Sequence, residues 1–181
     1  MMTPRSKPAP RRSRAAGSKR RRVLVVDDHP IVRRGLAQLV KQEQDLTICG
    51  EASNATEALA MVPEAKPNIV LVDISLEGTN GIELTKTLHQ RHPDLPVLVL
   101  SMHDEVLYAE RALRAGAKGY LMKGVSGNRL VTGIRDALRG RMVVSRETAA
   151  HLRRNLVKRP LNRGRGRAFS PTAWPRRRPW P

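Results

Sequence analysis

The sequence predicts an α/β fold: a doubly wound, five-stranded parallel sheet with helices on both faces, flanked by disordered basic tails. Short, uninterrupted runs of apolar and β-branched residues are typical of strands that are buried on both faces. Amphipathic helical patterns separate these runs, and a strict alternation of strands and helices favours a parallel sheet. The charges support the same division, because basic residues without acidic neighbours are concentrated at the two ends of the chain.

Five segments have the pattern of buried strands. Each is short enough to be one strand of a small domain, and three of them are unbroken apolar runs. The unbroken runs are 23-VLVV-26, 69-IVLVD-73 and 97-VLVL-100, and the weaker segments are 46-LTICGEA-52 and 119-GYLM-122.

Helices are expected between and after these strands. Pro30 stands at a plausible first helical position, and Asn54 can cap the second helix. Gly116 and Gly140 are suited to end the fourth and fifth helices, because glycine readily adopts a left-handed conformation. A further amphipathic stretch, 145-SRETAAHLRRNLV-157, predicts one more helix after the sheet.

The 181-residue chain has a formal net charge of +18, and the excess lies at its two ends. Residues 1–22 hold 9 basic and no acidic residues, and residues 158–181 hold 8 basic and no acidic residues. The part between them holds 17 basic and 16 acidic residues, as expected of a nearly neutral globular domain. We therefore expect a basic disordered leader at 1–22, a globular domain at 23–140, a linker helix at 141–157 and a basic disordered tail at 158–181.

The composition excludes several classes of protein. The single cysteine, Cys49, allows no intrachain disulfide and no cysteine zinc cluster, and it suits a reducing cytoplasm. No apolar run approaches the roughly 20 residues of a membrane-spanning helix, and the N-terminus lacks the apolar core of a secretory signal. We therefore expect a cytoplasmic protein without a membrane partner.

Polar residues follow the ends of the predicted strands. Asp27 and Asp28 follow the first strand, Asp73 ends the third, Ser101 follows the fourth and Lys123 follows the fifth. Because the carboxyl ends of parallel strands lie at one edge of a sheet, these residues are expected to form one site. Clustered carboxylates favour a cation, and a set of oxygen ligands favours Mg²⁺ over zinc. A nearby lysine and hydroxyl suit the oxygens of a phosphoryl group.

Each of these residues alone also has a purely structural explanation. The two adjacent acids could cap the helix that follows them, and Asp73 could simply pair with Lys123. A serine such as Ser101 is common in turns, and Tyr120 is a plausible core residue. The functional interpretation depends on the occurrence of all of them, in this order, at one edge.

Four motifs stand in this order along the chain: 24-LVVDDHPIVRRGL-36, 69-IVLVDISLEGTNGIEL-84, 97-VLVLSMHDE-105 and 116-GAKGYLMKG-124. Together they resemble the receiver (CheY-like) domain of bacterial two-component response regulators. The opening DDHP-x-x-RRGL and the segment GAKGYLMK resemble the NarL/FixJ subfamily. The resemblance covers roughly residues 23–140, and it implies the flavodoxin-like receiver fold.

The resemblance implies a phosphorelay with a role for each acidic residue. Asp73 would accept a phosphoryl group from a phosphohistidine on a sensor histidine kinase. Asp28, Asp73 and the main-chain carbonyl of Ser75 would hold Mg²⁺, with Asp27 nearby and acting through water. His29 has no catalytic role in this pattern and is interpreted as a helix-entry residue.

The resemblance also implies a switch. Lys123 would pair with the phosphoryl oxygens, Ser101 would move toward them and form a hydrogen bond, and Tyr120 would change rotamer in concert. The surface made by the fourth helix, fifth strand and fifth helix would then carry the signal, and phosphorylation could form a homodimer. Such a protein is a phosphoacceptor with at most slow self-dephosphorylation and not an enzyme. One departure is Gly124, where many receivers have a proline.

The end of the chain departs further from this subfamily, whose members usually continue into a helix-turn-helix DNA-binding domain. Only 24 residues follow Val157, and no Leu, Ile, Val or Met follows Leu161, so no core is expected there. We therefore expect a shortened transcriptional regulator without sequence-specific DNA binding. The tail could be an out-of-frame reading of a GC-rich gene, a basic tail that binds nucleic acid non-specifically, or an inert disordered segment.

Two other functions remain open at this point. The chain could be a nucleic-acid-binding protein that acts through its basic tails and carries a degenerate receiver. It could also be an aspartate-nucleophile phosphohydrolase, although such enzymes need a D-x-D motif and the first-strand acids, Asp27 and Asp28, are adjacent. A dinucleotide site is excluded because no G-x-G-x-x-G follows the first strand.

Overall fold

The computed structural model describes residues 20–158. The leader predicted at 1–22, except its last three residues, and the tail predicted at 158–181, except Lys158, therefore lie outside the described residues. Within the described part, five strands form one parallel sheet in the order β2-β1-β3-β6-β7. These strands are β1 (Arg21–Val26), β2 (Leu46–Ala52), β3 (Ile69–Asp73), β6 (Val97–Ser101) and β7 (Gly119–Met122). The predicted fold class is confirmed.

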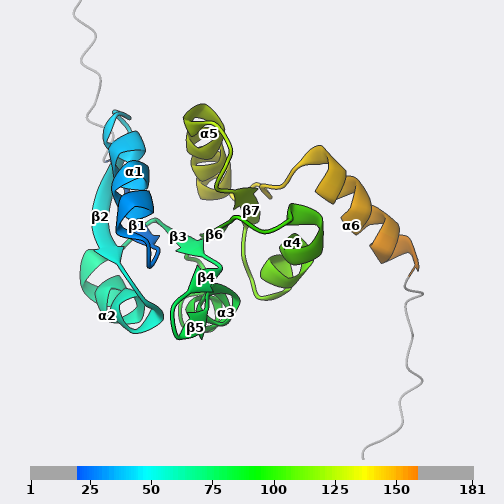
Figure 1. The fold of residues 1–181 in the computed structure, drawn as a ribbon, viewed down its shortest axis with the longest axis horizontal. Coiled ribbons are helices and arrows are strands. Elements are labelled where there is room, and N and C mark those ends of the chain that lie inside the picture. Colours follow the sequence, from blue (N-terminus) through cyan, green and yellow to red (C-terminus); the bar gives the residue numbers. More distant parts are fainter. Residues whose placement is uncertain (1–19, 159–181) are drawn as a thin grey trace, which may run out of the picture.

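Helices cover both faces of the sheet, and one more helix lies beyond the edge of the sheet formed by β7 (Figure 1). Their bounds are α1 (Pro30–Lys41), α2 (Ala55–Ala65), α3 (Gly81–Arg91), α4 (Glu105–Arg114), α5 (Gly127–Leu138) and α6 (Arg146–Lys158). The helix predicted from the pattern at 145–157 is therefore present as α6. Residues 141–145 before it are not helical; Val143 forms a bridge with Gly119 at the free edge of β7.

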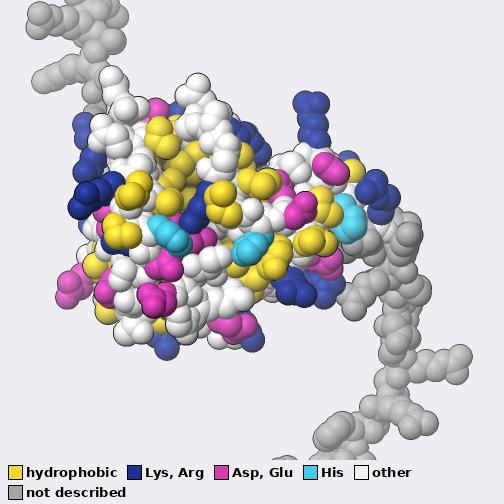
Figure 2. Space-filling model, in the orientation of Figure 1, with side chains coloured by type: hydrophobic (Ala, Val, Ile, Leu, Met, Phe, Trp, Pro, Cys, Tyr) yellow, Lys and Arg dark blue, Asp and Glu magenta, His cyan; other side chains and the backbone are white. Residues whose placement is uncertain are grey.

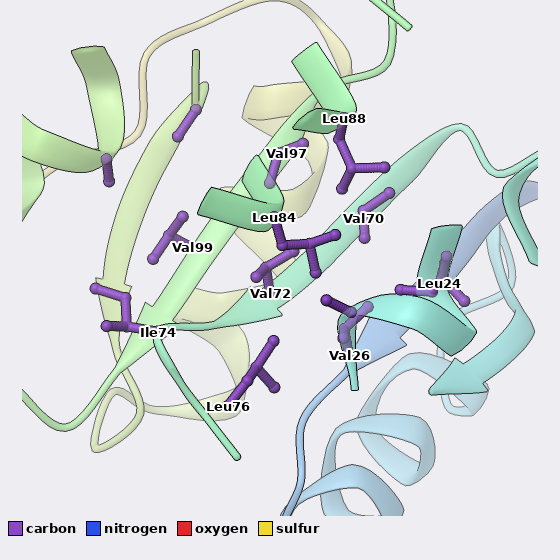
Figure 3. Packing of buried hydrophobic residues seen from close by; sticks show 14 of the residues in the cluster. Leu24, Val26, Val70, Val72, Ile74, Leu76, Leu84, Leu88, Val97 and Val99 are labelled. Atoms are coloured by element: carbon purple, nitrogen blue, oxygen red, sulfur yellow. The ribbon is translucent and has the colours of Figure 1, made fainter. Parts of the chain in front are cut away.

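Two separate apolar layers hold these helices to the sheet. One layer joins alternate residues of β1, such as Leu24 and Val26, to α2, α3 and α4, and includes Leu84 and Leu88 of α3 (Figure 3). The other layer joins the intervening residues of the same strand to α1 and α5. Strand side chains alternate between the faces, and both faces are covered, so every residue from Val23 to Val26 is buried. For this reason the central strands appear in the sequence as unbroken runs of apolar residues.

Local signals in the sequence account for many of the helix ends. The side chain of Asn54 accepts a hydrogen bond from the backbone N–H of Glu57 at 2.9 Å, as expected of an N-cap. Ser126 caps α5 through the N–H of Arg129 in the same way. Gly116 and Gly140 follow α4 and α5 with φ values of +103° and +77°, which glycine adopts at little cost.

The sequence did not predict a small hairpin that connects β3 to α3. Its strands, β4 (Ser75–Leu76) and β5 (Thr79–Asn80), are antiparallel and two residues long. The hairpin brings the start of α3 back against the end of β3, where the N–H of Gly81 donates to the carbonyl of Ile74 at 2.9 Å. A Cβ atom at residue 81 would lie 1.9 Å from the carbonyl oxygen of Asp73, so only glycine fits there.

We predict that Gly81→Ala lowers the free energy of unfolding by about 2 kcal/mol, because the new methyl group forces the hairpin away from the backbone of Asp73. Gly35→Ala is the matched control, since a Cβ atom at this position in α1 meets nothing within 4 Å. It should raise the free energy of unfolding by about 0.5 kcal/mol through helix propensity and a less flexible unfolded chain. Urea unfolding measures both, and equal stability of the two variants would contradict the steric argument.

Candidate functional site

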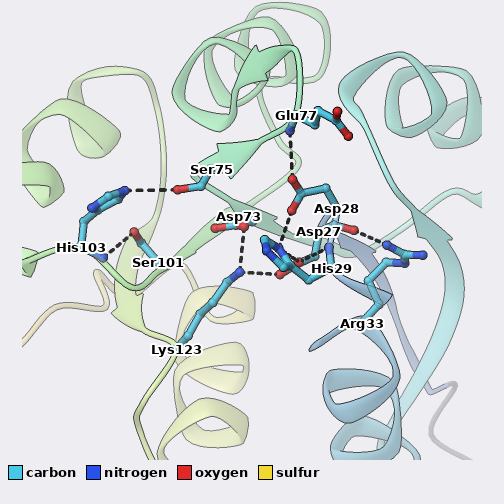
Figure 4. Close-up of polar contacts among 10 residues, drawn as sticks. All are labelled: Asp27, Asp28, His29, Arg33, Asp73, Ser75, Glu77, Ser101, His103 and Lys123. Carbon is cyan, nitrogen blue, oxygen red and sulfur yellow. Dashed lines mark hydrogen bonds and ion pairs between the residues drawn. The ribbon is translucent and has the colours of Figure 1, made fainter. Parts of the chain in front are cut away.

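The predicted site residues converge at one edge of the sheet (Figure 4). Asp27 follows β1, Asp73 is the last residue of β3, Ser101 is the last residue of β6 and Lys123 follows β7. These strands run parallel, so their carboxyl ends meet at this edge. Asp28 completes the site, and ligand atoms of the three aspartates and His29 all lie within 4.8 Å of one another. We refer to Asp27, Asp28 and Asp73 together as the acidic group.

Lys123 joins two buried carboxylates. Its Nζ lies 2.7 Å from Oδ2 of Asp27 and 2.7 Å from Oδ2 of Asp73. The side chains of Asp27 and Asp73 are 1% and 2% exposed, so each charge would be costly without a close partner. Burial works against the charge of Lys123, but the hydrogen bonds that it donates to both carboxylates outweigh this effect and raise the pKa of the lysine above its ordinary value. The ammonium group therefore stays charged at neutral pH.

Asp28 lies at the outer side of this group. Its Oδ2 accepts a hydrogen bond of 3.1 Å from the backbone N–H of Glu77, in the β4–β5 hairpin. Its Oδ1 is buried and lies 2.6 Å from Nδ1 of His29, but it receives no hydrogen bond of acceptable geometry from the described residues. His29 is the residue before α1, as predicted, and its side chain also contacts the acidic group.

The acidic group fits a divalent cation. Three carboxylates face one lysine, so negative charge remains after the Lys123 pairs are counted. The buried Oδ1 of Asp28 has an unused lone pair, which a bound ion would satisfy. Carboxylate oxygens are the ligands that Mg²⁺ prefers, and Mg²⁺ is usually held by one or two of them plus water. The donor set therefore suits this ion better than a soft metal.

Ser101 and Tyr120 are connected through His103, in the loop between β6 and α4. The backbone N–H of His103 donates to Oγ of Ser101 at 3.0 Å. The hydroxyl of Tyr120 donates to the carbonyl oxygen of His103 at 2.8 Å. Ser101 and Tyr120 are both fully buried. Burial raises the pKa of the Tyr120 phenol, which therefore stays a neutral donor.

The sequence analysis did not identify His103, although it contacts several parts of the site. Its ring stacks on Tyr108 of α4 with centroids 4.8 Å apart, and its Nε2 lies 3.1 Å from Oγ of Ser75. Gly81 and the backbone of Glu77 were also missed. Their roles depend on the hairpin, and a two-residue strand has no periodic pattern from which it could be predicted.

The structure is thus a five-stranded doubly wound α/β domain with three aspartates, a serine and a lysine at the carboxyl edge of its sheet. The sequence matches the family described as "Response regulator receiver domain" over residues 23–135. The chain belongs to this family.

Individual relatives support this assignment. The chain is 39% identical to "DNA-binding transcriptional activator DevR/DosR" of Mycobacterium tuberculosis over 131 residues. The matched region covers 72% of this chain and 60% of that protein. The chain is 33% identical over 137 residues to "Nitrate/nitrite response regulator protein NarL" of Escherichia coli, covering 74% and 63%. The chain thus spans about three-fifths of the length of these curated relatives.

Solved structures agree with the sequence comparison. A two-component response regulator of the LuxR family from Aurantimonas superposes with a TM-score of 0.70 at 34% identity, covering 77% of this chain and 99% of that one. The receiver domain of the putative response regulator NarL from Mycobacterium tuberculosis gives a TM-score of 0.65 at 29% identity, covering 68% and 99%. Among the described residues, no helix combines the length and the apolar character needed to cross a membrane.

We predict that Mg²⁺ stabilises the folded chain through the acidic group. A cation that binds only the native state adds RT ln(1 + [Mg²⁺]/Kd), or about 2.7 kcal/mol at 100 times Kd. Asp28→Asn should lose most of this gain, because it removes one charge and weakens the acceptor atoms that face the ion. Without Mg²⁺ the same variant should be at least as stable as wild type, since it relieves repulsion among the carboxylates.

Thermal unfolding with and without Mg²⁺ measures both effects. Asp94→Asn is the matched control, because this exposed aspartate lies before β6, at the opposite end of the sheet. An equal Mg²⁺ response of Asp28→Asn and Asp94→Asn would show that the ion does not bind at the acidic group.

Proposed function

We propose that the chain is a receiver whose Asp73 accepts a phosphoryl group and thereby changes the conformation of the domain. The observation that carries this proposal is the placement of Asp73, buried at the carboxyl edge of the sheet, 2.7 Å from Lys123 and beside two further aspartates. The membership of the chain in the response regulator receiver family supports it.

Asp73 has one carboxylate oxygen available for the reaction. Lys123 is the described residue that donates to this carboxylate, and its bond falls on Oδ2. In the proposed step, Oδ1 attacks the phosphorus of a phosphohistidine on a sensor histidine kinase. The new Oδ1–P bond forms as the P–N bond breaks, and the electron pair returns to the imidazole nitrogen. Burial of Asp73 limits access of water to the acyl phosphate.

The remaining residues of the site would serve the charge of the transferred group. Asp28, Asp73 and the main-chain carbonyl of Ser75 would hold Mg²⁺, with Asp27 acting through water. When bound, this ion would neutralise charge on the phosphoryl oxygens. Lys123 already lies against Asp73 and would pair with a phosphoryl oxygen by a charge-assisted hydrogen bond.

Ser101 and Tyr120 would convert this local charge into a change of shape. A dianion on Asp73 attracts the Ser101 hydroxyl as a donor. The same hydroxyl accepts the N–H of His103, whose carbonyl binds Tyr120, so a shift of Ser101 disturbs the contacts that keep Tyr120 in its present rotamer. The chemistry is that of a switch, with slow self-dephosphorylation instead of turnover.

The edge that carries Asp73 has the properties of a docking surface for a kinase. Hydrophobic side chains border the acidic group on the face shown in Figure 2. Three exposed or partly exposed hydrophobic residues stand close in sequence to the carboxyl ends of strands: Ile31 at the start of α1 (84%), Met102 after β6 (73%) and Met122 at the end of β7 (39%). Exposed apolar side chains around a polar centre are typical of protein–protein contact sites. We propose a sensor histidine kinase as the partner, a cytoplasmic location for the chain, and a transcriptional role like that of the relatives.

Transfer from a small donor tests the function directly. With acetyl phosphate and Mg²⁺, the Asp73 oxygen forms its bond to phosphorus as the bond to the acetyl oxygen breaks, and acetate leaves. Intact-mass spectrometry should show one added phosphoryl group on the wild-type chain, none on Asp73→Asn, and little without Mg²⁺. Asp94→Asn should be phosphorylated like wild type.

A folded wild-type chain without the adduct would overturn the receiver assignment. Steady release of phosphate from a simple phosphomonoester would instead favour the phosphohydrolase interpretation. Loss of the adduct in both aspartate variants would point to a general defect and not to a specific acceptor.

A further inference from the structure

Basic side chains gather at the edge of the sheet opposite the acidic group, where the central strands begin. Arg21 is the first residue of β1, Lys66 caps the end of α2 before β3, and Arg91 ends α3 before β6. Strand β1 has 6 residues. At about 3.3 Å per residue, its two ends lie roughly 20 Å apart, so the proposed chemistry of the acidic group does not use these cations.

Two adjoining clefts bring the cations together. One cleft, of about 400 Å³, is lined in part by residues 20–22, and the other, of about 590 Å³, is lined in part by Arg91 and His92. Lys66 and Asn68 line both clefts, so the two share a wall. We refer to the five cations around these clefts as the basic edge: Arg20, Arg21, Arg22, Lys66 and Arg91.

The basic edge carries charge that the described part of the chain does not neutralise. All of its members except Arg22 are exposed, and none of them takes part in an ion pair with a described carboxylate. Glu64 and Asp94 also line the clefts, and these two carboxylates against five cations leave a net charge of +3. Clustered charge of one sign along a cleft attracts ligands of the opposite sign.

Lys66 has a backbone conformation that favours glycine. Its φ and ψ of 40° and 59° are left-handed, and it is the one non-glycine residue with positive φ in the part of the chain that the structure describes. Helices commonly end on glycine in this conformation, because a Cβ atom is unfavourable there. An unfavourable backbone conformation kept at one position is typical of ligand-binding sites.

Hydrogen bonds fix the backbone beneath these side chains. The N–H of Arg22 donates to Oδ1 of Asn68 at 2.9 Å, and the N–H of Asn68 donates to the carbonyl of Arg22 at 2.7 Å. Nε of Arg22 donates to the carbonyl of Ala65, the last residue of α2, at 2.7 Å. The start of β1 is thus tied to the end of α2, so less freedom is lost when a ligand binds the basic edge.

The leader adds to the charge at this edge. Residues 1–19 hold six basic residues and no acidic residue, and the chain runs from them directly into Arg20. Their charges are therefore tethered beside the clefts. The number of cations that reach one polyanion decides its affinity, because each phosphate contact releases condensed counterions.

The chemistry of this surface favours the phosphate backbone of duplex nucleic acid. Arginine can bind phosphate oxygens through two parallel N–H groups. Single strands are usually bound by aromatic side chains that stack on bases, and neither the basic edge nor the leader contains an aromatic residue. Anionic membranes are usually bound with the help of inserted apolar side chains. The leader has no Leu, Ile or Val, and none of the exposed large hydrophobic residues lines either cleft.

We propose that the basic edge and the leader bind the phosphate backbone of duplex nucleic acid without sequence preference. The inference goes beyond the proposed function, because this site lies at the other end of the strands from Asp73. Phosphate contacts of this kind position a domain on the duplex and read no bases.

Fluorescence anisotropy of the full chain with two short DNA duplexes of unrelated sequence tests the proposal. Wild type should bind both duplexes equally, and the logarithm of the association constant should fall linearly with the logarithm of the salt concentration. Lys66→Gln and Arg91→Gln should each lower the steepness of this dependence by about 0.9. The affinity of each variant at about 0.1 M salt should then be weaker on the order of eightfold, equally for both duplexes.

Lys86→Gln is the matched control. Lys86 is an exposed lysine of α3 that lines neither cleft, so the same change of charge there should leave the affinity close to that of wild type. Lys66→Gly provides a second test of the same position, because it removes the cation and suits the left-handed backbone. It should be at least as stable in urea as wild type and should bind duplex as weakly as Lys66→Gln.

Three outcomes would overturn the proposal. The first is no binding of either duplex at low salt. The second is equal affinity of Lys86→Gln and the basic-edge variants, which would assign the binding to the tails alone. The third is binding to phosphatidylserine vesicles without binding to duplex, which would indicate a membrane partner. Acetyl phosphate should still phosphorylate Lys66→Gln, because Lys66 lies far from the acidic group, so the failure of this site and the failure of the proposed function are distinguishable.

Discussion

The structure depends on one buried arrangement, in which the ammonium group of Lys123 lies 2.7 Å from a carboxylate oxygen of both Asp27 and Asp73. Two carboxylates that are almost fully buried repel each other and lose hydration, so each needs a positive partner. One lysine from the end of β7 serves both, and it thereby ties together the ends of β1, β3 and β7 across the sheet. Because the pairing still leaves a net negative charge with Asp28, the site is suited to a cation and to a phosphoryl group.

At the same edge of the sheet, near the proposed acceptor Asp73 (Figure 4), the loop after β6 joins Ser101 to helix α4. The loop around His103 contacts Ser101 through its N–H, Tyr120 through its carbonyl and Tyr108 through its ring. These contacts lie in a compact loop between β6 and α4, so a charge placed on Asp73 has a short physical route to α4. Ser101 and Tyr120, which this exposed loop contacts, are fully buried, and packed interiors favour discrete arrangements because they deform little.

Most of the fold follows from local rules. The unbroken apolar runs occur because both faces of every central strand are covered, and the caps at Asn54 and Ser126 follow from side chains that satisfy free N–H groups. The site residues could be proposed from their positions alone, since parallel strands bring their carboxyl ends to one edge. His103 and Gly81 could not be found in this way, because their roles arise from contacts with residues far along the chain or from a hairpin too short to show a period.

The sequence by itself thus determined the fold class, the order of the elements and the convergence of Asp27, Asp28, Asp73, Ser101 and Lys123. These depend on hydrophobic periodicity and on chain direction, which are local properties. Only the tertiary structure decided that Lys123 bridges two carboxylates, that Oδ1 of Asp28 receives no hydrogen bond from the described part of the chain, and that Val143 pairs at the edge of β7. These are distances between segments separated by many residues, and no local pattern encodes them, because packing of the whole domain sets them.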